Sequence, residues 1–129
     1  MAGRARRGWW GEEPPYRHDV FVHTHHLRPD LPMPGGTTFR FIDEPIETVL
    51  GRAFAAAAGR DVCLAGGGGT LRQYLRAGPV DEMHLAVVPV FAGRGDHLLD
   101  RLGGDGADGF RVAALLSSAA ATHAPPVPG

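Results

Sequence analysis

The chain has 129 residues, 43% of them hydrophobic and 21% charged, which fits a single globular domain and excludes an intrinsically disordered class. A formal net charge of −1 excludes an overall field that attracts nucleic acid or an anionic membrane surface. The sequence contains neither an apolar run of membrane-helix length nor a signal-peptide pattern, so we expect a cytoplasmic protein with no nucleic-acid or membrane partner.

The first part of the chain, residues 1–17, predicts a loose N-terminal segment. It is rich in glycine, arginine, proline and acidic residues and has neither helical nor strand period. A solvated end explains the local arginine cluster of Arg4, Arg6 and Arg7. Trp9-Trp10 is the one large apolar feature there, which suggests packing onto a domain or a contact with a partner.

Two strands and a helix are predicted next. The β-branched and aromatic segments 20–24 and 37–42 favour strands, separated by a loop rich in proline and glycine. Asp43 or Glu44 is expected to cap the following helix, in which apolar residues recur at helical spacing from 46 to 57. Gly59 is expected to end it, because glycine adopts a left-handed conformation at little cost.

Residues 61–65 predict a short strand that leads into four glycines and a second helix with Leu71, Tyr74 and Leu75 facing inward. Its apolar neighbours predict a buried, inert thiol for Cys63, the single cysteine. The apolar segment 83–90 predicts a central strand covered on both faces, and a last strand is possible at 111–116. A disordered tail is expected at 124–129. The alternation of strands and helices favours an α/β fold with a mostly parallel sheet flanked by helices.

The glycine run is the most informative local motif. A strand that ends in glycines and leads into a helix directs backbone N–H groups toward a phosphate, and glycine lets the ligand approach closely. The run is not a Walker loop, because no Lys-Ser or Lys-Thr follows it, and Leu71 occupies the third glycine position of the dinucleotide fingerprint. A tight turn therefore remains the alternative to a phosphate site.

The other polar motifs do not need a catalytic or metal-binding role to be explained. His23 and His25 would lie on one side of a strand, but a zinc site needs three or four ligands, so no metal site is expected among the four histidines His18, His23, His25 and His26. A small metal-binding protein would need a further ligand cluster. Capping and solvation account for Asp81-Glu82, and a structural role suffices for His84 and His123.

Six blocks of the sequence, taken together and in order, resemble the bacterial dihydrofolate-reductase-like group that includes the RibD C-terminal reductase domain of riboflavin biosynthesis. The blocks are VFVHTHH from Val20, GGTTFRF from Gly35, GGG from Gly66, LRQYLRAG from Leu71, VDEMHL from Val80 and PVFAGRG from Pro89. The resemblance covers residues 9 to about 102. It implies a partial domain of that fold over 18–123, incomplete at both ends.

The resemblance also implies a cofactor, NADPH, bound across the sheet. It places the glycines Gly66, Gly67 and Gly68 against the pyrophosphate, with Thr70 opening the helix behind them. It places Thr24 and His25 near the adenosine ribose and its 2′-phosphate, with Arg28 as a cationic partner. Hydroxyl, imidazole and guanidinium groups all donate hydrogen bonds to phosphate. The choice between NADPH and NADH stays open.

The activity implied is that of an NADPH-dependent oxidoreductase, similar to 5-amino-6-(5-phosphoribosylamino)uracil reductase, acting on a small pyrimidine or pterin-like molecule. This chain would supply mainly the cofactor-binding half, and no residue is nominated as catalytic. Family members commonly form homodimers, to which Trp9-Trp10 would contribute. The alternative is a non-catalytic nucleotide-binding or interaction fragment.

Overall fold

The computed structural model describes residues 11–100, 102 and 109–128, and the chain divides into two compact units, residues 1–63 and 64–129. The division falls inside the range 18–123, predicted to be one partial domain. The arginine cluster and Trp9-Trp10 lie outside the described residues.

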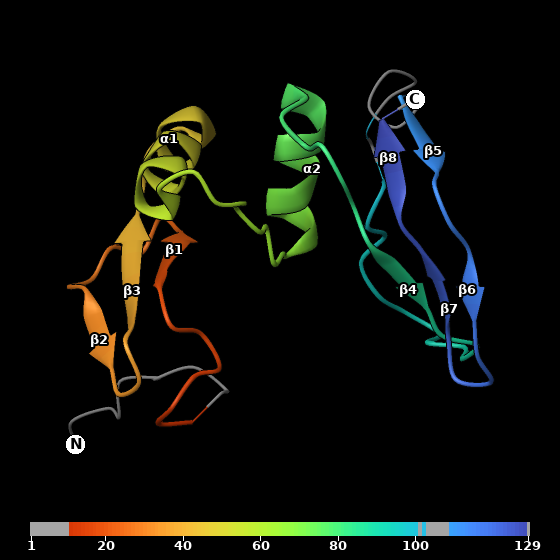
Figure 1. Ribbon diagram of the computed structural model, residues 1–129, viewed down its shortest axis with the longest axis horizontal. Coiled ribbons are helices and arrows are strands. Elements are labelled where there is room, and N and C mark those ends of the chain that lie inside the picture. Colours follow the sequence, from red (N-terminus) through yellow and green to blue (C-terminus); the bar gives the residue numbers. More distant parts are fainter. Residues whose placement is uncertain (1–10, 101, 103–108, 129) are drawn as a thin grey trace. The chain divides into compact units, whose positions relative to one another are not determined.

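The first unit contains a three-stranded sheet (Figure 1). Strand β1 (Asp19–His23) pairs in parallel with β3 (Thr37–Ile42), and β2 (Leu31–Met33) pairs antiparallel with the other side of β3. The strands predicted at 20–24 and 37–42 are therefore confirmed. Strand β2 lies in the predicted loop, where Pro32 is tolerated because an edge strand can direct the position that lacks an N–H away from its partner.

Helix α1 (Ile46–Ala57) follows β3, as predicted, but begins differently. Pro45, not Asp43 or Glu44, is the N-cap residue, and its carbonyl accepts the first backbone hydrogen bonds, from Thr48 and Val49. Its extended ψ of 149° keeps it outside the helix, so the acidic residues lie too early to cap the first turn. The helix ends at Ala58, which adopts a left-handed conformation one residue before Gly59.

The first unit has a small core formed by residues of the sheet and of α1. Met33, Ile42 and Val49 are buried, from β2, β3 and α1 respectively. Thr37 is 1% exposed, and its hydroxyl donates to the carbonyl of Tyr16. Buried residues therefore lie at both ends of β3: Met33 pairs with Thr37 at its start, and Ile42 lies at its end, where the chain leaves the sheet for α1.

Arg40, in the middle of β3, ties the strands together at their surface. Its guanidinium contacts the carboxylates of Asp19 and Asp30, each at 2.7 Å. The hydrogen bond and charge of Asp19, followed by the charge and hydrogen bond of Asp30, raise the pKa of Arg40. Arg40 therefore stays charged over the working pH range and bridges β1 and the residue before β2.

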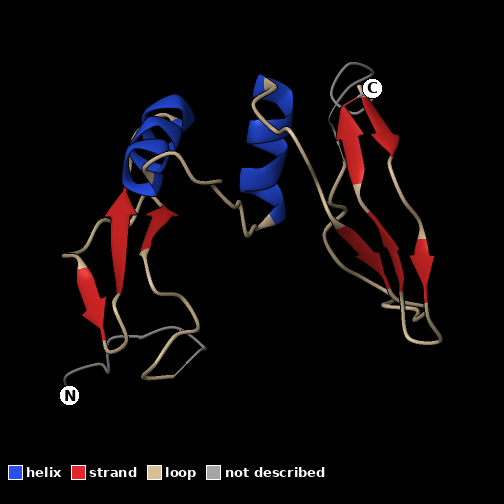
Figure 2. Ribbon diagram, in the orientation of Figure 1, coloured by secondary structure: helices blue, strands red, loops and turns tan. Residues whose placement is uncertain are grey.

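The second unit begins with the segment that contains the glycines and helix α2 (Gly68–Ala77). Tyr74 and Leu75 are buried and Gly78 ends the helix with a φ of 85°, so the prediction for this helix is confirmed. The strand predicted at 61–65 was wrong, because this segment has no strand in the structure (Figure 2). An extended apolar segment becomes a strand only where a neighbouring strand accepts and donates its backbone hydrogen bonds.

In the described part of the second unit, five short strands follow, arranged in two antiparallel sheets (Figure 2). Strand β7 (Thr122–Ala124) lies between β4 (Leu85–Val87) and β6 (Leu116–Ser117), while β5 (Phe110–Val112) pairs with β8 (Pro126–Pro128). The central strand predicted at 83–90 was wrong: only β4 forms, at the edge of its sheet. Val87 and Val90 are 62% and 69% exposed. An apolar pattern on both faces shows that a strand could be buried on both sides. It does not show whether other elements pack against those faces.

The expected tail also differs, because Pro126–Pro128 forms β8. The amide of Ala113 donates to the carbonyl of Pro125, so in this register alternate positions of β8 carry the hydrogen bonds to β5. Pro126 and Pro128 occupy the other positions, where a missing N–H removes no bond from the ladder. Only β1 and β3 pair in parallel among the described residues, so the mostly parallel sheet is not confirmed, while the mixed α/β character is.

Candidate functional site

In the first unit, the predicted adenosine-binding residues lie just beyond the carboxyl end of β1. Because β1 and β3 are parallel and His23 is level with Ile42, the residues that follow both strands meet at one edge of the sheet. The amide of Thr24 donates to the carbonyl of Ile42 at 2.9 Å, which extends the ladder by one residue. The Thr24 hydroxyl accepts a hydrogen bond from the amide of His26 at 3.1 Å, which turns the chain away from the sheet.

His25 is held at this edge by a carboxylate. Its Nδ1 lies 2.8 Å from Oδ1 of Asp43, the first residue after β3. The side chain of His25 is 89% exposed, so its other ring nitrogen faces solvent, and that of Asp43 is 40% exposed. Asp43 was considered only as a helix cap from the sequence. The sequence signal that could have linked it to His25 is its position: each residue follows the end of one of two strands expected to be parallel.

Arg28 lies in the exposed loop that follows, over the face of an aromatic ring. Its guanidinium carbon is 4.4 Å from the centroid of the Phe41 ring, a cation–π contact. This contact uses the flat face of the guanidinium, whereas its N–H donors lie in the plane of the group. Arg28 is thereby oriented beside β3 with donors suited to an anion.

In the second unit, the glycine run forms the entry to α2. Gly67 is the N-cap residue, and its carbonyl accepts the amide of Leu71 at 2.9 Å. Gly68 and Thr70 belong to the first turn of the helix, whose leading N–H groups have no partner within the helix. A Cβ atom placed on Gly66 or Gly67 would meet nothing within 4 Å, so the backbone here is open to a ligand.

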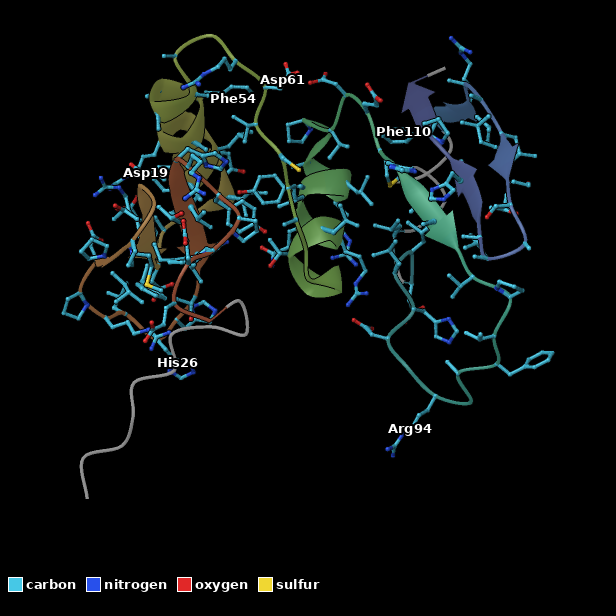
Figure 3. The ribbon with its side chains drawn as sticks, turned by 60° about the horizontal axis from the view of Figure 1, so that its bottom comes forward. Asp19, His26, Phe54, Asp61, Arg94 and Phe110 are labelled. Carbon is cyan, nitrogen blue, oxygen red and sulfur yellow. The ribbon has the colours of Figure 1, made fainter. Side chains whose placement is uncertain are left out.

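An ion pair not anticipated from the sequence lies beside Gly68. Asp96 brings Oδ2 within 2.9 Å of where a Cβ of Gly68 would stand, and it pairs with Arg72 of α2 at 3.3 Å. Arg72 is mostly buried, and its guanidinium also donates to the carbonyl of His97 at 2.7 Å. The loop that carries Asp96 also carries Arg94, whose exposed side chain extends from the chain in Figure 3. Spacing along the chain gives no signal for a contact across 24 residues.

The predicted site residues thus divide between the units. Thr24, His25 and Arg28 follow β1 in the first unit, whereas Gly66, Gly67, Gly68 and Thr70 lead into α2 in the second. Thr24 and His25 lie at the edge where β1 and β3 end, and Arg28 contacts the Phe41 ring of β3. Each cluster offers hydrogen-bond donors, and each includes one carboxylate near them, Asp43 or Asp96.

Other polar candidates lie outside these clusters. Among the residues that the structure describes, no group of three or more His, Cys, Asp or Glu side chains is arranged to hold a metal ion. Nδ1 of His18 lies 2.8 Å from the Asp19 carbonyl, and Asp81 and Glu82 are exposed. Cys63 is exposed, so the prediction of a buried thiol was wrong: the segment joins no sheet that would cover it.

Within the described part of the chain, no helix has the length and apolar character needed to cross a membrane. Both helices are short, and each exposes polar side chains along one side.

The comparison with protein families gives a match. The family model of the RibD C-terminal domain matches residues 45–116, which is more than half of the chain. The matched range runs from the start of α1 through the glycine run, α2 and β4 to β6. A search of curated proteins found no match. On the family match, the chain belongs to the RibD C-terminal domain family.

Proposed function

We propose that this chain acts as the cofactor-binding part of an NADPH-dependent reductase, similar to the 5-amino-6-(5-phosphoribosylamino)uracil reductase of riboflavin biosynthesis. The observation that carries the proposal is the family match over residues 45–116, which includes the open glycine entry to α2. The substrate class is a small pyrimidine or pterin-like molecule.

Each unit, taken by itself, offers groups suited to one part of the cofactor. Backbone N–H groups at Gly66, Gly67 and Gly68, with the hydroxyl of Thr70, would hold the pyrophosphate at the positive end of α2. Thr24, His25 and Arg28 would hold the ribose and its 2′-phosphate. NADPH, when bound, supplies the hydride, and the protein supplies orientation.

The carboxylate of Asp96 lies near Gly68 and would repel the negative charge of a phosphate bound there. Its negative charge is offset by the guanidinium of Arg72, which lies 3.3 Å away. The same guanidinium also donates a hydrogen bond to the carbonyl of His97. A phosphate that approached α2 would compete with Asp96 for the same cation. The net local charge therefore does not exclude a phosphate.

The direct test is calorimetric titration of the purified 129-residue chain with NADPH, with NADH as the control. Saturable binding that is tighter for NADPH is expected, because Arg28 and His25 offer donors to the 2′-phosphate. A folded chain that binds neither nucleotide would contradict the proposal.

The Asp43→Asn substitution provides a second test. Removing the carboxylate 2.8 Å from His25 takes a negative charge away from the proposed 2′-phosphate position. We expect NADPH to bind about fivefold more tightly, because removing one exposed repulsive charge changes the binding free energy by up to about 1 kcal/mol. The affinity for NADH, which has no 2′-phosphate, is expected to change little. The measurement is the ratio of the two dissociation constants, with Glu47→Gln, an exposed acid on α1, as the matched control. An unchanged ratio would remove Asp43 from the site.

A second candidate function is a non-catalytic interaction module, and one observation favours it. Val87, Val88, Val90 and Phe91 lie in or after β4 and are between 52% and 108% exposed. Such apolar exposure is typical of surfaces that a partner covers. A homodimer, proposed also for the reductase, would bury the same side chains, and light scattering after size exclusion measures it. Self-association without nucleotide binding would favour the interaction module.

A further inference from the structure

Two histidines from distant parts of the sequence meet in the second unit. Nε2 of His84, just before β4, lies 3.0 Å from Nδ1 of His123 in β7, and the ring centroids are 5.1 Å apart. His84 is exposed and His123 is half-buried.

The strand register accounts for this meeting. His123 pairs directly with Ala86, and His84 lies two residues before Ala86 along the same strand direction. His84 is the residue directly before β4, so it lies diagonally across from His123, just beyond the paired part of the strand. The pairing of β4 with β7 therefore brings the two histidines near each other.

We propose that His84 and His123 together bind one divalent transition-metal ion of the Ni²⁺ and Cu²⁺ class. With N–metal bonds of about 2.1 Å, nitrogens 3.0 Å apart correspond to an N–metal–N angle of roughly 90°. That angle matches adjacent positions of a square-planar or octahedral site, the geometries that Ni²⁺ and Cu²⁺ adopt with nitrogen ligands. Water completes the coordination, because no third protein ligand is grouped with the pair in the described residues.

Metal binding replaces the hydrogen bond between the rings. The nitrogen that donates this bond must release its proton, and its ring takes up a proton on the other nitrogen, so the neutral pair binds the ion without a net change in protonation. The two rings must turn so that both nitrogens point toward the ion, and the exposure of His84 leaves room for its ring to turn. This inference is independent of the reductase proposal.

The experiment is calorimetric titration of the whole chain with Ni²⁺, with Mg²⁺ as the hard-cation control. His84→Ala and His123→Ala are each expected to weaken the Ni²⁺ site at least about tenfold, because each breaks a chelate. The double variant is expected to bind no more weakly than either single variant. His18→Ala, an exposed histidine in the first unit, is the matched control and is expected to bind as the original chain does.

A second readout is thermal stability. Ni²⁺ is expected to raise the melting temperature of the original chain and of His18→Ala, since a bridge between residues 84 and 123 stabilises the paired strands, but not that of His84→Ala. Unchanged Ni²⁺ affinity in both single variants would overturn the proposal. So would losses that simply add in the double variant, because they would indicate two independent histidines.

Discussion

Replacement of Gly67 by valine is expected to weaken NADPH binding at least about 100-fold without disturbing the fold. Gly67 has a φ of −80° and a ψ of −172°, which any residue adopts, and its Cβ would meet no atom within 4 Å. The valine side chain would instead fill the space through which phosphate oxygens reach the N–H groups of α2. Calorimetry measures the loss, and circular dichroism checks the fold.

Gly69→Ala is the matched control for this variant. Gly69 lies in the first turn of α2, and a Cβ there would be 4.0 Å from a guanidinium nitrogen of Arg72, an ordinary contact. Alanine favours the helix by about 1 kcal/mol relative to glycine, so binding is expected to persist. Gly66 is unsuitable because its φ is 123°. Normal NADPH binding by Gly67→Val would place the pyrophosphate elsewhere.

Ile42→Ala is expected to have the largest effect on stability, about 2–5 kcal/mol in the free energy of unfolding of the first unit. Ile42 is 7% exposed at the end of β3, and its carbonyl accepts the amide of Thr24. The substitution leaves a cavity where the sheet meets α1. Hydrogen exchange measures this loss of stability: the backbone amides of β1 and β3 are expected to exchange faster than in the original chain.

Phe54→Ala on α1 is the control for this second variant. The Phe54 side chain is 49% exposed, so its removal is expected to cost less than about 1 kcal/mol despite the larger volume deleted. If Ile42→Ala exchanged no faster than Phe54→Ala, Ile42 would not be part of the core of the first unit.

The sequence by itself determined the local elements that have strong periodicity or clear breakers. The stripe from Ile46 to Ala57 and the glycine that follows predicted α1 to within two residues of its ends. Tyr74 and Leu75 were correctly predicted to face inward, and the glycine run was correctly predicted to lead into α2. These features depend on backbone conformation and spacing within a few residues, which sequence reports directly. The family resemblance rests on the same local blocks, and the family match confirms it.

Only the tertiary structure decided which segments find partners. The apolar segment 61–65 forms no strand, 83–90 supplies an edge strand, and Pro126–Pro128 pairs with β5. The contacts of His25 with Asp43 and of Arg72 with Asp96 join residues 18 and 24 positions apart. The physical reason is the same in each case: strand pairing and ion pairing depend on which groups fold into reach, and local composition does not encode that distance.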